Sequence, residues 1–248
     1  MISSSSNQRI KDIKKSVANG NIIFLDTQNL IEEVFASSWL VEFIVYENGK
    51  NEEFISQFNC EKIEVSHDVL KSLTNVESSS GVAAAVKIQN GLPQEPLGSY
   101  VVLENVQDPG NVGTIIRSAV GSGFLDIILI GSAKVMNPKT FRASSGAIFK
   151  ANISELKNID EFFEINKNWN LPLIGTSMTG ENIFSCTMPK EFGLVLGNEG
   201  QGISKEMLKK CNKIVSIPMI NGLESLNVGV AGSIIMFEKK FGGKHVRT

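Results

Sequence analysis

Short apolar runs alternate along this chain with stretches in which apolar residues recur at every third or fourth position. Short runs are typical of buried strands, and the wider spacing is typical of amphipathic helices. In the first part of the chain the pattern predicts strands at 22–25, 43–46 and 82–86 and helices near 28–37 and 67–74. Strands that alternate with helices indicate an α/β fold.

Residues 89–98 contain two prolines and two glycines, which is typical of a linker. We therefore expect one domain in residues 1–88 and a second in residues 99–248. The second domain is predicted to hold strands at 99–105, 126–130, 171–175, 193–197 and 213–217 and helices at 111–121, near 138–145, near 160–168, at 204–210 and from 225. This alternation indicates a mostly parallel sheet covered on both faces, with ligands bound at the carboxyl ends of its strands.

The composition excludes several classes of protein. There are 24 Lys and Arg against 26 Asp and Glu, so any basic surface for nucleic acid must be local. Three widely spaced cysteines and two histidines predict neither a disulfide scaffold nor a metal site, and they suit a reducing compartment. No run approaches the ~18 apolar residues of a membrane span. The serine-rich start faintly resembles a transit peptide, but its brevity and Asp12 favour a cytoplasmic amino terminus.

The loop after strand 99–105 carries polar residues that suit a phosphate group. Asn111 stands where a helix N-cap is expected, and free backbone N–H groups beside Arg117 would seat an anion there. Gly113, four residues before Arg117, is expected to leave room in front of the guanidinium. The alternative is ordinary: Asn111 caps a helix and Arg117 is a solvated helix residue.

Two later loops have comparable features. A buried strand runs into a glycine-rich turn around Glu199, where a ligand can approach the backbone closely. Ser225 and Asn227 stand at the start of the last predicted helix. Taken singly, each loop equally suits a tight turn or a helix cap. The glycines of the first of these loops are Gly197, Gly200 and Gly202.

Two common nucleotide motifs are absent from the second domain. Residues 106–111 follow its first strand without the glycine fingerprint of a dinucleotide site. The nearest approach to a Walker loop, residues 175–180, continues with Glu181, whose charge would repel phosphate. A nicotinamide-dependent enzyme is therefore disfavoured.

In their order and spacing the three loops resemble the SpoU/TrmH family of RNA ribose 2′-O-methyltransferases, within the SPOUT superfamily. The matching pieces are residues 111–117 (Asn-Val-Gly-Thr-Ile-Ile-Arg), 197–200 (Gly-Asn-Glu-Gly) and 225–228 (Ser-Leu-Asn-Val), with Ile217-Pro218 ahead of the third. The resemblance covers about residues 99–242. It implies a mostly parallel-sheet SPOUT domain with a carboxyl-terminal trefoil knot, which pattern reasoning would not suggest because knots are nearly absent among folds.

The resemblance also implies a cofactor and a set of site residues. S-Adenosylmethionine would be contacted, largely through the backbone, by Thr176, Gly197, Ile217 and Leu226. The catalytic residues it implies are Asn111, Arg117, Glu199, Ser225 and Asn227. A further family-like loop, residues 139–147, would touch the target nucleotide through Arg142 and Ser145, although a surface arginine in a polar turn is the alternative.

We expect a distinct role for each catalytic residue. A guanidinium stays protonated up to pH ~12, so Arg117 is expected to hold an RNA phosphate and stabilise developing negative charge rather than to act as a base. Asn111, Ser225 and Asn227 would orient the ribose and the cofactor. Glu199 would fix the loops or help to relay a proton.

The first domain is similar to the small ribosomal-protein-like RNA-binding domain of many family members. The matching pieces are residues 7–11, 65–70 and 80–84, and they make Arg9 and Lys11 candidates for RNA binding. The chain departs from the family at Asp26-Thr27, where a Glu-Gly pair is frequent. Basic residues, which commonly precede this strand in the family, are also sparse between Lys15 and Ile22.

The sequence thus predicts a cytoplasmic, S-adenosylmethionine-dependent RNA 2′-O-methyltransferase. Ribosomal RNA is the favoured substrate because the additional RNA-binding domain is typical of that branch of the family, and transfer RNA is the alternative. A non-catalytic RNA-binding or ribosome-assembly factor on the same fold is the alternative class. Relatives are homodimers, and a face of small residues suits close helix packing within the chain or with a second subunit. That face consists of Gly229, Gly232, Ser233 and Met236.

Overall fold

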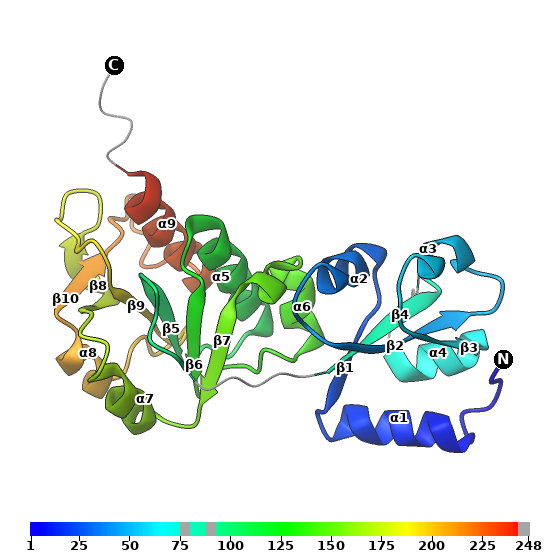
Figure 1. Cartoon of the computed structure of the whole chain (residues 1–248). Helices are drawn as coiled ribbons and strands as arrows, with labels where there is room; N and C mark the ends of the chain where they lie inside the picture. Colours follow the sequence, from blue (N-terminus) through cyan, green and yellow to red (C-terminus); the bar gives the residue numbers. More distant parts are fainter. Residues whose placement is uncertain (75–79, 88–92, 243–248) are drawn as a thin grey trace. The chain divides into compact units, whose positions relative to one another are not determined.

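The computed structural model describes residues 1–74, 80–87 and 93–242 and divides the chain into two compact units, residues 1–89 and 90–248 (Figure 1). Each unit has its own sheet and its own core, and each is described by itself below. Residues 89–92 of the predicted linker lie outside the described residues.

The first unit is a four-stranded mixed sheet in the order β1-β4-β2-β3. Strand β4 runs antiparallel to β1 and β2, and β2 runs parallel to β3. Its elements are α1 (Gln8–Ala18), β1 (Ile22–Leu25), α2 (Gln28–Phe35), β2 (Val41–Glu47), α3 (Glu52–Ser56), β3 (Glu61–Val65), α4 (His67–Thr74) and β4 (Val82–Lys87).

The predicted strands and helices of this unit are present, but the sequence pattern did not predict α1, α3 and β3. Helix α1 buries only Ile10 and Ile13, and β3 buries only Ile63 and Val65. Both elements are rich in charged residues, which hide their few apolar positions in the sequence pattern. Ile10 and Ile13 nevertheless join the α4 residues in one core against the sheet, which is what holds α1 in place.

The second unit is a six-stranded sheet in the order β10-β8-β9-β5-β6-β7, and every pairing in it is parallel. This confirms the predicted α/β fold with a parallel sheet, while the knot stays a prediction of the family resemblance. The elements are β5 (Tyr100–Glu104), α5 (Pro109–Ser122), β6 (Asp126–Ile130), α6 (Pro138–Ser144), the 3-10 helix η1 (Ala147–Lys150), β7 (Asn152–Leu156), α7 (Ile159–Asn166), β8 (Leu173–Asn182), β9 (Gly193–Leu196), α8 (Lys205–Lys210), β10 (Lys213–Ser216) and α9 (Val228–Phe241).

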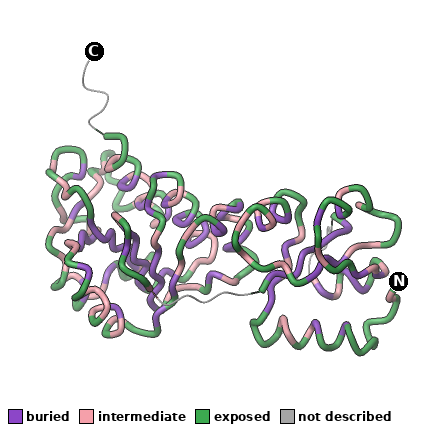
Figure 2. Tube along the Cα trace, in the orientation of Figure 1, coloured by how far each residue is buried: buried purple, intermediate pink, exposed green. Residues whose placement is uncertain are grey.

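Strand β5 lies in the interior of this sheet, and its side chains alternate between two helical layers. Tyr100 and Val102 belong to a core with Phe162 of α7 and Met207 of α8. On the opposite face α5 packs against α9, and Leu196 of β9 lies beneath α9. Figure 2 shows the buried residues following the strands of each sheet. Loops at the carboxyl end of β5 are therefore anchored to the best-buried part of the unit.

Two helices begin two or three residues away from the predicted positions. Helix α5 begins at Pro109, and Asp108 is its N-cap, accepting a hydrogen bond from the Gly110 N–H. Helix α9 begins at Val228 with Asn227 as its N-cap, so Ser225 lies outside the helix. Proline is favoured at the first position of a helix because its missing N–H would have no helical partner there.

Strand β8 is longer than predicted and contains an interruption. Ile214 and Val215 are consecutive in β10, yet they pair with residues of β8 that are six apart. Residues 176–180 therefore leave the ladder before β8 resumes. Thr176 lies at the start of this excursion, within β8 rather than in a loop after it. None of the helices in the described ranges has the length and apolarity needed to cross a membrane.

Close packing at the start of β9 gives a stability prediction. A Cβ at Gly193 would lie 2.5 Å from ring carbon Cζ of Tyr100. The Tyr100 ring cannot easily move away, because its hydroxyl donates to Asn166 and its ring packs edge-on against Trp169. We expect Gly193→Ala to lower the free energy of unfolding by about 1–3 kcal/mol, as overpacked cores do.

The measurement is denaturant unfolding followed by Trp169 fluorescence, with Trp39 replaced by Phe so that only the second unit reports. Gly98→Ala is the control, because a Cβ at Gly98 would meet nothing within 4 Å. The prediction is wrong if both alanine variants unfold at the same denaturant concentration as the parent.

Candidate functional site

The loop after β9 is hydrogen-bonded to the segment that follows β5. The Glu199 carboxylate accepts hydrogen bonds from the backbone N–H groups of Gln107 and Asp108, each at 3.2 Å. It also accepts one from the Asn111 side-chain amide at 2.9 Å. Because the parallel strands β5 and β9 are neighbours, their following loops lie at the same edge of the sheet. One carboxylate therefore joins two of the three loops.

Asn111 extends this connection to the third loop. Its Oδ1 accepts a hydrogen bond from Nδ2 of Asn227 at 2.9 Å. Asn227 Oδ1 in turn accepts from the N–H groups of Gly229 and Val230, at 2.9 and 3.3 Å, as the N-cap of α9. A carboxylate can only accept, so Glu199 fixes which end of each amide faces its neighbour. The structure thus brings Asn111, Glu199 and Asn227 together in one directed chain of hydrogen bonds.

Two carboxylates at the beginning of α5 have shifted pKa values. Burial raises the pKa of Glu199, but the hydrogen bonds from Asn111 and the backbone lower it by more, so it lies below its usual value. The pKa of Asp108 is also lowered, chiefly by the hydrogen bond from Lys139 and then by the Gly110 N–H. Lys139 Nζ lies 2.9 Å from Asp108 Oδ1. Both carboxyls are therefore ionised at neutral pH.

The expected phosphate seat at the N-terminus of α5 is wrong. The N-cap is Asp108 rather than Asn111, and the N–H groups of residues 107, 108 and 110 are bonded to the carboxylates of Asp108 and Glu199. Two negative charges would repel a phosphate there. Asn111 instead lies inside the first turn, where its side chain is available to Glu199 and Asn227.

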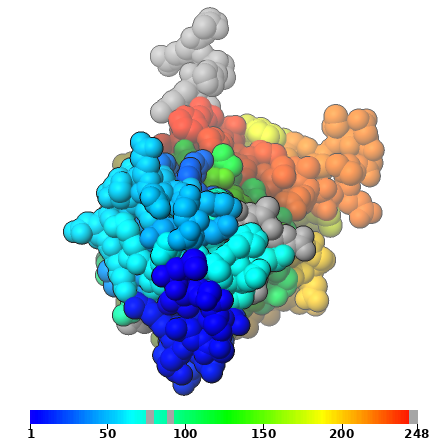
Figure 3. All heavy atoms as spheres, turned by 90° about the vertical axis from the view of Figure 1, so that its right-hand side faces the viewer, coloured from blue at the N-terminus to red at the C-terminus, as the bar shows by residue number. Residues whose placement is uncertain are grey.

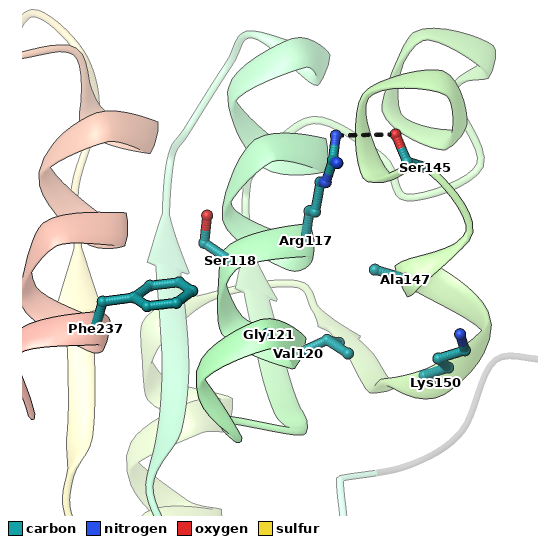
Figure 4. Close-up of a pocket in the computed structure, with 8 residues that line it drawn as sticks. All are labelled: Arg117, Ser118, Val120, Gly121, Ser145, Ala147, Lys150 and Phe237. Carbon is teal, nitrogen blue, oxygen red and sulfur yellow. Dashed lines mark hydrogen bonds between the residues drawn. The ribbon is translucent and has the colours of Figure 1, made fainter. Parts of the chain in front are cut away.

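Arg117 lies on the exposed side of α5, six residues after Asn111, which is about 9 Å along the helix axis. One of its guanidinium nitrogens donates to Ser145 Oγ at 3.2 Å (Figure 4). Ser145 is the C-cap of α6 and has a left-handed backbone, with φ 47°. The structure therefore brings Arg117 to Ser145, while Arg142 is exposed on α6.

A pocket of about 390 Å³ lies beside Arg117. Figure 4 shows Arg117 and Lys150 on the side formed by α5, α6 and η1, and Phe237 of α9 across from them. The pocket thus combines two cationic side chains with hydroxyl groups and an aromatic ring. Such a lining suits an anionic group with an attached planar ring, as a nucleotide has.

Gly113 does not have the expected position in front of the Arg117 guanidinium. A Cβ at Gly113 would lie 2.5 Å from the Thr140 carbonyl oxygen and 2.6 Å from Cβ of Ala143. The absence of a side chain at Gly113 therefore allows α6 to approach α5 closely. This contact indirectly holds Ser145 near Arg117, because Ser145 directly follows α6.

The residues expected to contact the cofactor lie around strand ends. Gly197 is buried, and a Cβ there would lie 2.3 Å from the backbone of residues 202 and 203, so the neck of this loop closes on itself. Thr176 donates to the Val195 carbonyl at 3.2 Å, which holds it beside β9. Ile217 and Leu226 are partly buried at the two ends of the segment between β10 and α9.

That segment, residues 217–226, has a backbone suited to holding a ligand. To the described part of the chain it makes a single backbone–backbone hydrogen bond, from Leu223 N to Ile220 O at 3.4 Å. Ile220 and Leu223 are 77% and 57% exposed, and Figure 3 shows this part of the chain, in orange, at the surface. Available backbone groups beside apolar side chains fit a cofactor with an adenine ring, such as S-adenosylmethionine.

Other candidate residues are not joined to this group. Ser225 is exposed and makes no hydrogen bond to the described residues. Arg9 and Lys11 lie in the first unit, on α1, where Arg9 forms an ion pair with Glu61 and Lys11 is exposed. Arg9 is half exposed, so a ligand would compete with Glu61 for its guanidinium.

The small residues of α9 pack within the chain. Ser233 Oγ lies 2.6 Å from Ser118 Oγ of α5, and a Cβ at Gly232 would lie 2.6 Å from Leu196. Of the two possibilities that the sequence left open, this face therefore contacts the chain's own helix and sheet. The apolar residues of α9 that remain exposed are Val230, Phe237 and Phe241.

Two asparagines that sequence reasoning did not identify also build the site. Asn198 donates from Nδ2 to the Asn105 carbonyl at 2.9 Å, and its Oδ1 accepts from the N–H groups of Gly200 and Gln201. Asn105 has a left-handed backbone, with φ 55°, which turns the chain at the end of β5. An Asn followed by a glycine two residues later is a turn signal that would have indicated Asn198.

Comparison with known proteins agrees with this architecture. The family model described as the SpoU rRNA Methylase family matches residues 98–237. The chain is 28% identical over 247 residues to the 23S rRNA (guanosine(2553)-2′-O)-methyltransferase RlmP of Bacillus subtilis strain 168, covering 95% of this chain and 97% of that protein.

Two solved structures have a closely similar fold. The SpoU methyltransferase AviRb of Streptomyces viridochromogenes matches with a TM-score of 0.79 and 25% identity, over 91% of each chain. An AdoMet-bound rRNA methyltransferase of Sinorhizobium meliloti matches with a TM-score of 0.83 and 24% identity, over 100% of this chain and 98% of that one. Since the family model covers more than half of the sequence, the chain belongs to the SpoU family of rRNA methylases.

Proposed function

We propose that this protein transfers a methyl group from S-adenosylmethionine to a ribose 2′-hydroxyl of RNA, and that its substrate is ribosomal RNA. The observation that carries the proposal is the chain of hydrogen bonds Asn227–Asn111–Glu199, which joins the three family motifs at one edge of the sheet. The Bacillus subtilis relative is by name a 23S rRNA 2′-O-methyltransferase that aligns over nearly the whole chain. Ribosomal RNA is therefore preferred to transfer RNA.

We assign cofactor binding to Gly197, Thr176, Ile217 and Leu226. When bound, the cofactor supplies an activated methyl group on a sulfonium. Close packing of the Gly197 backbone against residues 202 and 203 holds the loop rigid. The exposed backbone of residues 217–226 offers hydrogen-bond donors and acceptors to an adenosine. Binding through backbone groups requires little reorganisation, because those groups are already in place.

Arg117 acts on the acceptor side. Its guanidinium is a fixed positive charge with several donors, and it holds an RNA phosphate while stabilising negative charge on the 2′-oxygen. Ser145, 3.2 Å away, orients the guanidinium and contacts the target nucleotide together with Arg142. The proton of the 2′-hydroxyl passes to water or to the RNA phosphate that Arg117 holds, since a guanidinium does not take it.

The remaining catalytic residues position the ribose and the loops. Asn111 and Asn227 orient the ribose and the cofactor from their shared hydrogen bond, and Ser225 contributes a hydroxyl from the segment before α9. Glu199 keeps the loops in register through its three hydrogen bonds. This is the loop-fixing role of Glu199 rather than the proton-relay role.

We assign RNA substrate binding to the first unit, residues 1–88, connected by a linker at 89–98 to the methyltransferase domain at 99–248. Arg9 and Lys11 on α1 are its candidate contacts. The net charge of −2 means that the RNA is held by local basic surfaces, so binding weakens steeply with salt. We also propose that the protein is cytoplasmic, in keeping with a ribosomal RNA substrate.

The test of this function is a map of ribose methylation in total RNA from cells with and without the gene. We expect one mark in ribosomal RNA to disappear and to return with the wild-type gene. Arg117→Ala should not restore it, since losing a preorganised charge contact costs on the order of 10²-fold in turnover. Arg117→Lys keeps the charge but not the planar fork, and should restore it in part.

An unchanged methylation map would contradict the proposed function. A mark lost from transfer RNA instead would show that transfer RNA, and not ribosomal RNA, is the substrate. Turnover of Arg117→Lys equal to that of the wild type, with the same dependence on pH, would contradict phosphate holding by the guanidinium. Calorimetric titration with S-adenosylmethionine distinguishes the two classes of protein, because the enzyme is expected to bind the cofactor and a non-catalytic RNA-binding factor is not.

The loop-fixing role of Glu199 predicts a pH-dependent stability. Its lowered pKa means that it stabilises the fold fully above about pH 4.5, its ordinary value, and that this stabilisation is lost as the pH falls through the lower folded value. We expect Glu199→Gln to be less stable than the wild type by about 1 kcal/mol at pH 7, because its amide group faces three donors. The difference should shrink as the pH falls below 4.5 and through the folded pKa of Glu199.

Denaturant unfolding between pH 7 and pH 3 measures this difference. Glu95→Gln is the control, because Glu95 makes no hydrogen bond or ion pair with the described residues and should unfold like the wild type. A constant difference between Glu199→Gln and the wild type at all pH values would exclude the ionised carboxylate as its cause.

We also propose that two copies of the chain associate through α9. Val230, Phe237 and Phe241 are 45%, 42% and 43% exposed, and they recur along one helix at intervals of seven and four residues. Light scattering at micromolar protein should give the mass of a dimer. The double variant Phe237→Glu with Phe241→Glu should give that of a monomer, because it places charges on an apolar contact. A monomeric wild type would remove this proposal.

A further inference from the structure

Glu104 is a buried carboxylate that the proposed mechanism does not use. It is the last residue of β5 and is only 3% exposed, whereas the four residues before it in the strand are buried and not charged. Removing a carboxylate from water is costly unless the protein supplies hydrogen bonds in return. Its presence at this position therefore calls for a specific contact.

That contact is made with the loop that carries Glu199. Glu104 Oε2 accepts a hydrogen bond from the backbone N–H of Ser204 at 2.9 Å. Ser204 ends this loop and is the N-cap of α8, with its own hydroxyl accepting from Met207 N. Burial raises the pKa of Cys211, at the other end of α8, to about 11, and the charge of Glu104 contributes to that increase. Glu104 thus holds the residue at which α8 begins.

The neighbouring residue holds the other end of the same loop. Asn105 presents its carbonyl to Asn198 Nδ2 at 2.9 Å. Between these anchors the loop is closed by two backbone hydrogen bonds that link Asn198 and Gly202, at 2.9 and 3.0 Å. The end of β5 therefore holds the loop at its beginning through Asn105 and at its end through Glu104.

We propose that Glu104 is a positioning residue that fixes the loop of residues 197–204 in the conformation that binds the cofactor. This inference rests on the proposed function, since it assigns the loop to S-adenosylmethionine. Glu104 is not assigned a contact with the ribose that accepts the methyl group or with the cofactor that donates it. It acts through Ser204, and in this way on the backbone of Gly197 and the carboxylate of Glu199. What it must supply is a hydrogen-bond acceptor at a fixed, buried point.

The test compares three variants by calorimetric titration with S-adenosylmethionine. Glu104→Gln keeps an acceptor and should bind within about twofold of the wild type. Glu104→Met has a similar length but leaves the Ser204 N–H without its partner, and we expect its Kd to rise at least about tenfold. Val102→Ala, in the same strand and fully buried, is the control for lost stability and should keep the wild-type Kd.

Hydrogen exchange without the cofactor provides a second measurement. Amides of residues 197–204 should exchange faster in Glu104→Met than in the wild type, and they should not do so in Val102→Ala at the same temperature below unfolding. Equal exchange and equal Kd in Glu104→Met and the wild type would overturn the inference. So would a rise in Kd of the same size in Val102→Ala. A wild-type protein that does not bind the cofactor would instead overturn the proposed function.

A second pair of variants tests the same contact if Glu104→Met does not fold. Ser204 has φ −61°, which a proline can adopt, so Ser204→Pro removes the N–H that Glu104 accepts. Ser204→Ala removes only the hydroxyl cap and keeps that N–H. We expect a tenfold weaker Kd for Ser204→Pro and little change for Ser204→Ala. Equal values for the two variants would overturn the proposed contact.

Discussion

The Glu199 carboxylate can only accept hydrogen bonds, and three donors from the segment after β5 converge on it. This one constraint sets the orientation of the Asn111 amide, and through it that of Asn227 at the start of α9. Three loops that are far apart in sequence are thereby held in a fixed relation. The arrangement depends on an ionised carboxylate, and its hydrogen bonds keep the pKa of Glu199 below its usual value.

The parallel sheet makes this convergence possible. Strands β9 and β5 are neighbours and run in the same direction, so the turn around Glu199 and the start of α5 meet at one edge. On one face of the sheet α6 packs closely on Gly113 of α5, and Leu196 of β9 packs closely on Gly232 of α9, so neither glycine has room for a side chain. Arg117 and Ser145 then meet across the α5–α6 contact, away from the carboxylates at the N-terminus of α5. Negative and positive parts of the site are therefore separated along a single helix.

Much of the architecture follows from local sequence signals. The strand β6 and the helix α4 occupy the predicted residues, and the helix predicted at 204–210 is present as α8, with Ser204 as its N-cap. The pattern missed β3 and α1 because most of the residues around their few apolar positions are charged or polar. It misplaced the beginning of α5 because Asn111 and Asp108 are both suitable caps, and Pro109 decided between them. The continuation of β8 to Asn182 depends on pairing with β10, which no local signal encodes.

The sequence by itself determined the fold class, the order of the three motifs and the family to which they belong, because these depend on residue types and their spacing. Only the tertiary structure decided what each residue contacts. In the structure Gly113 allows two helices to pack closely, and the backbone N–H groups at the N-terminus of α5 are bonded to two carboxylates. Asn111 is hydrogen-bonded to Asn227, which lies 116 residues later. Glu104 and Asn198 belong to the site only because parallel strands bring distant loops together, and spacing along one chain carries no record of that proximity.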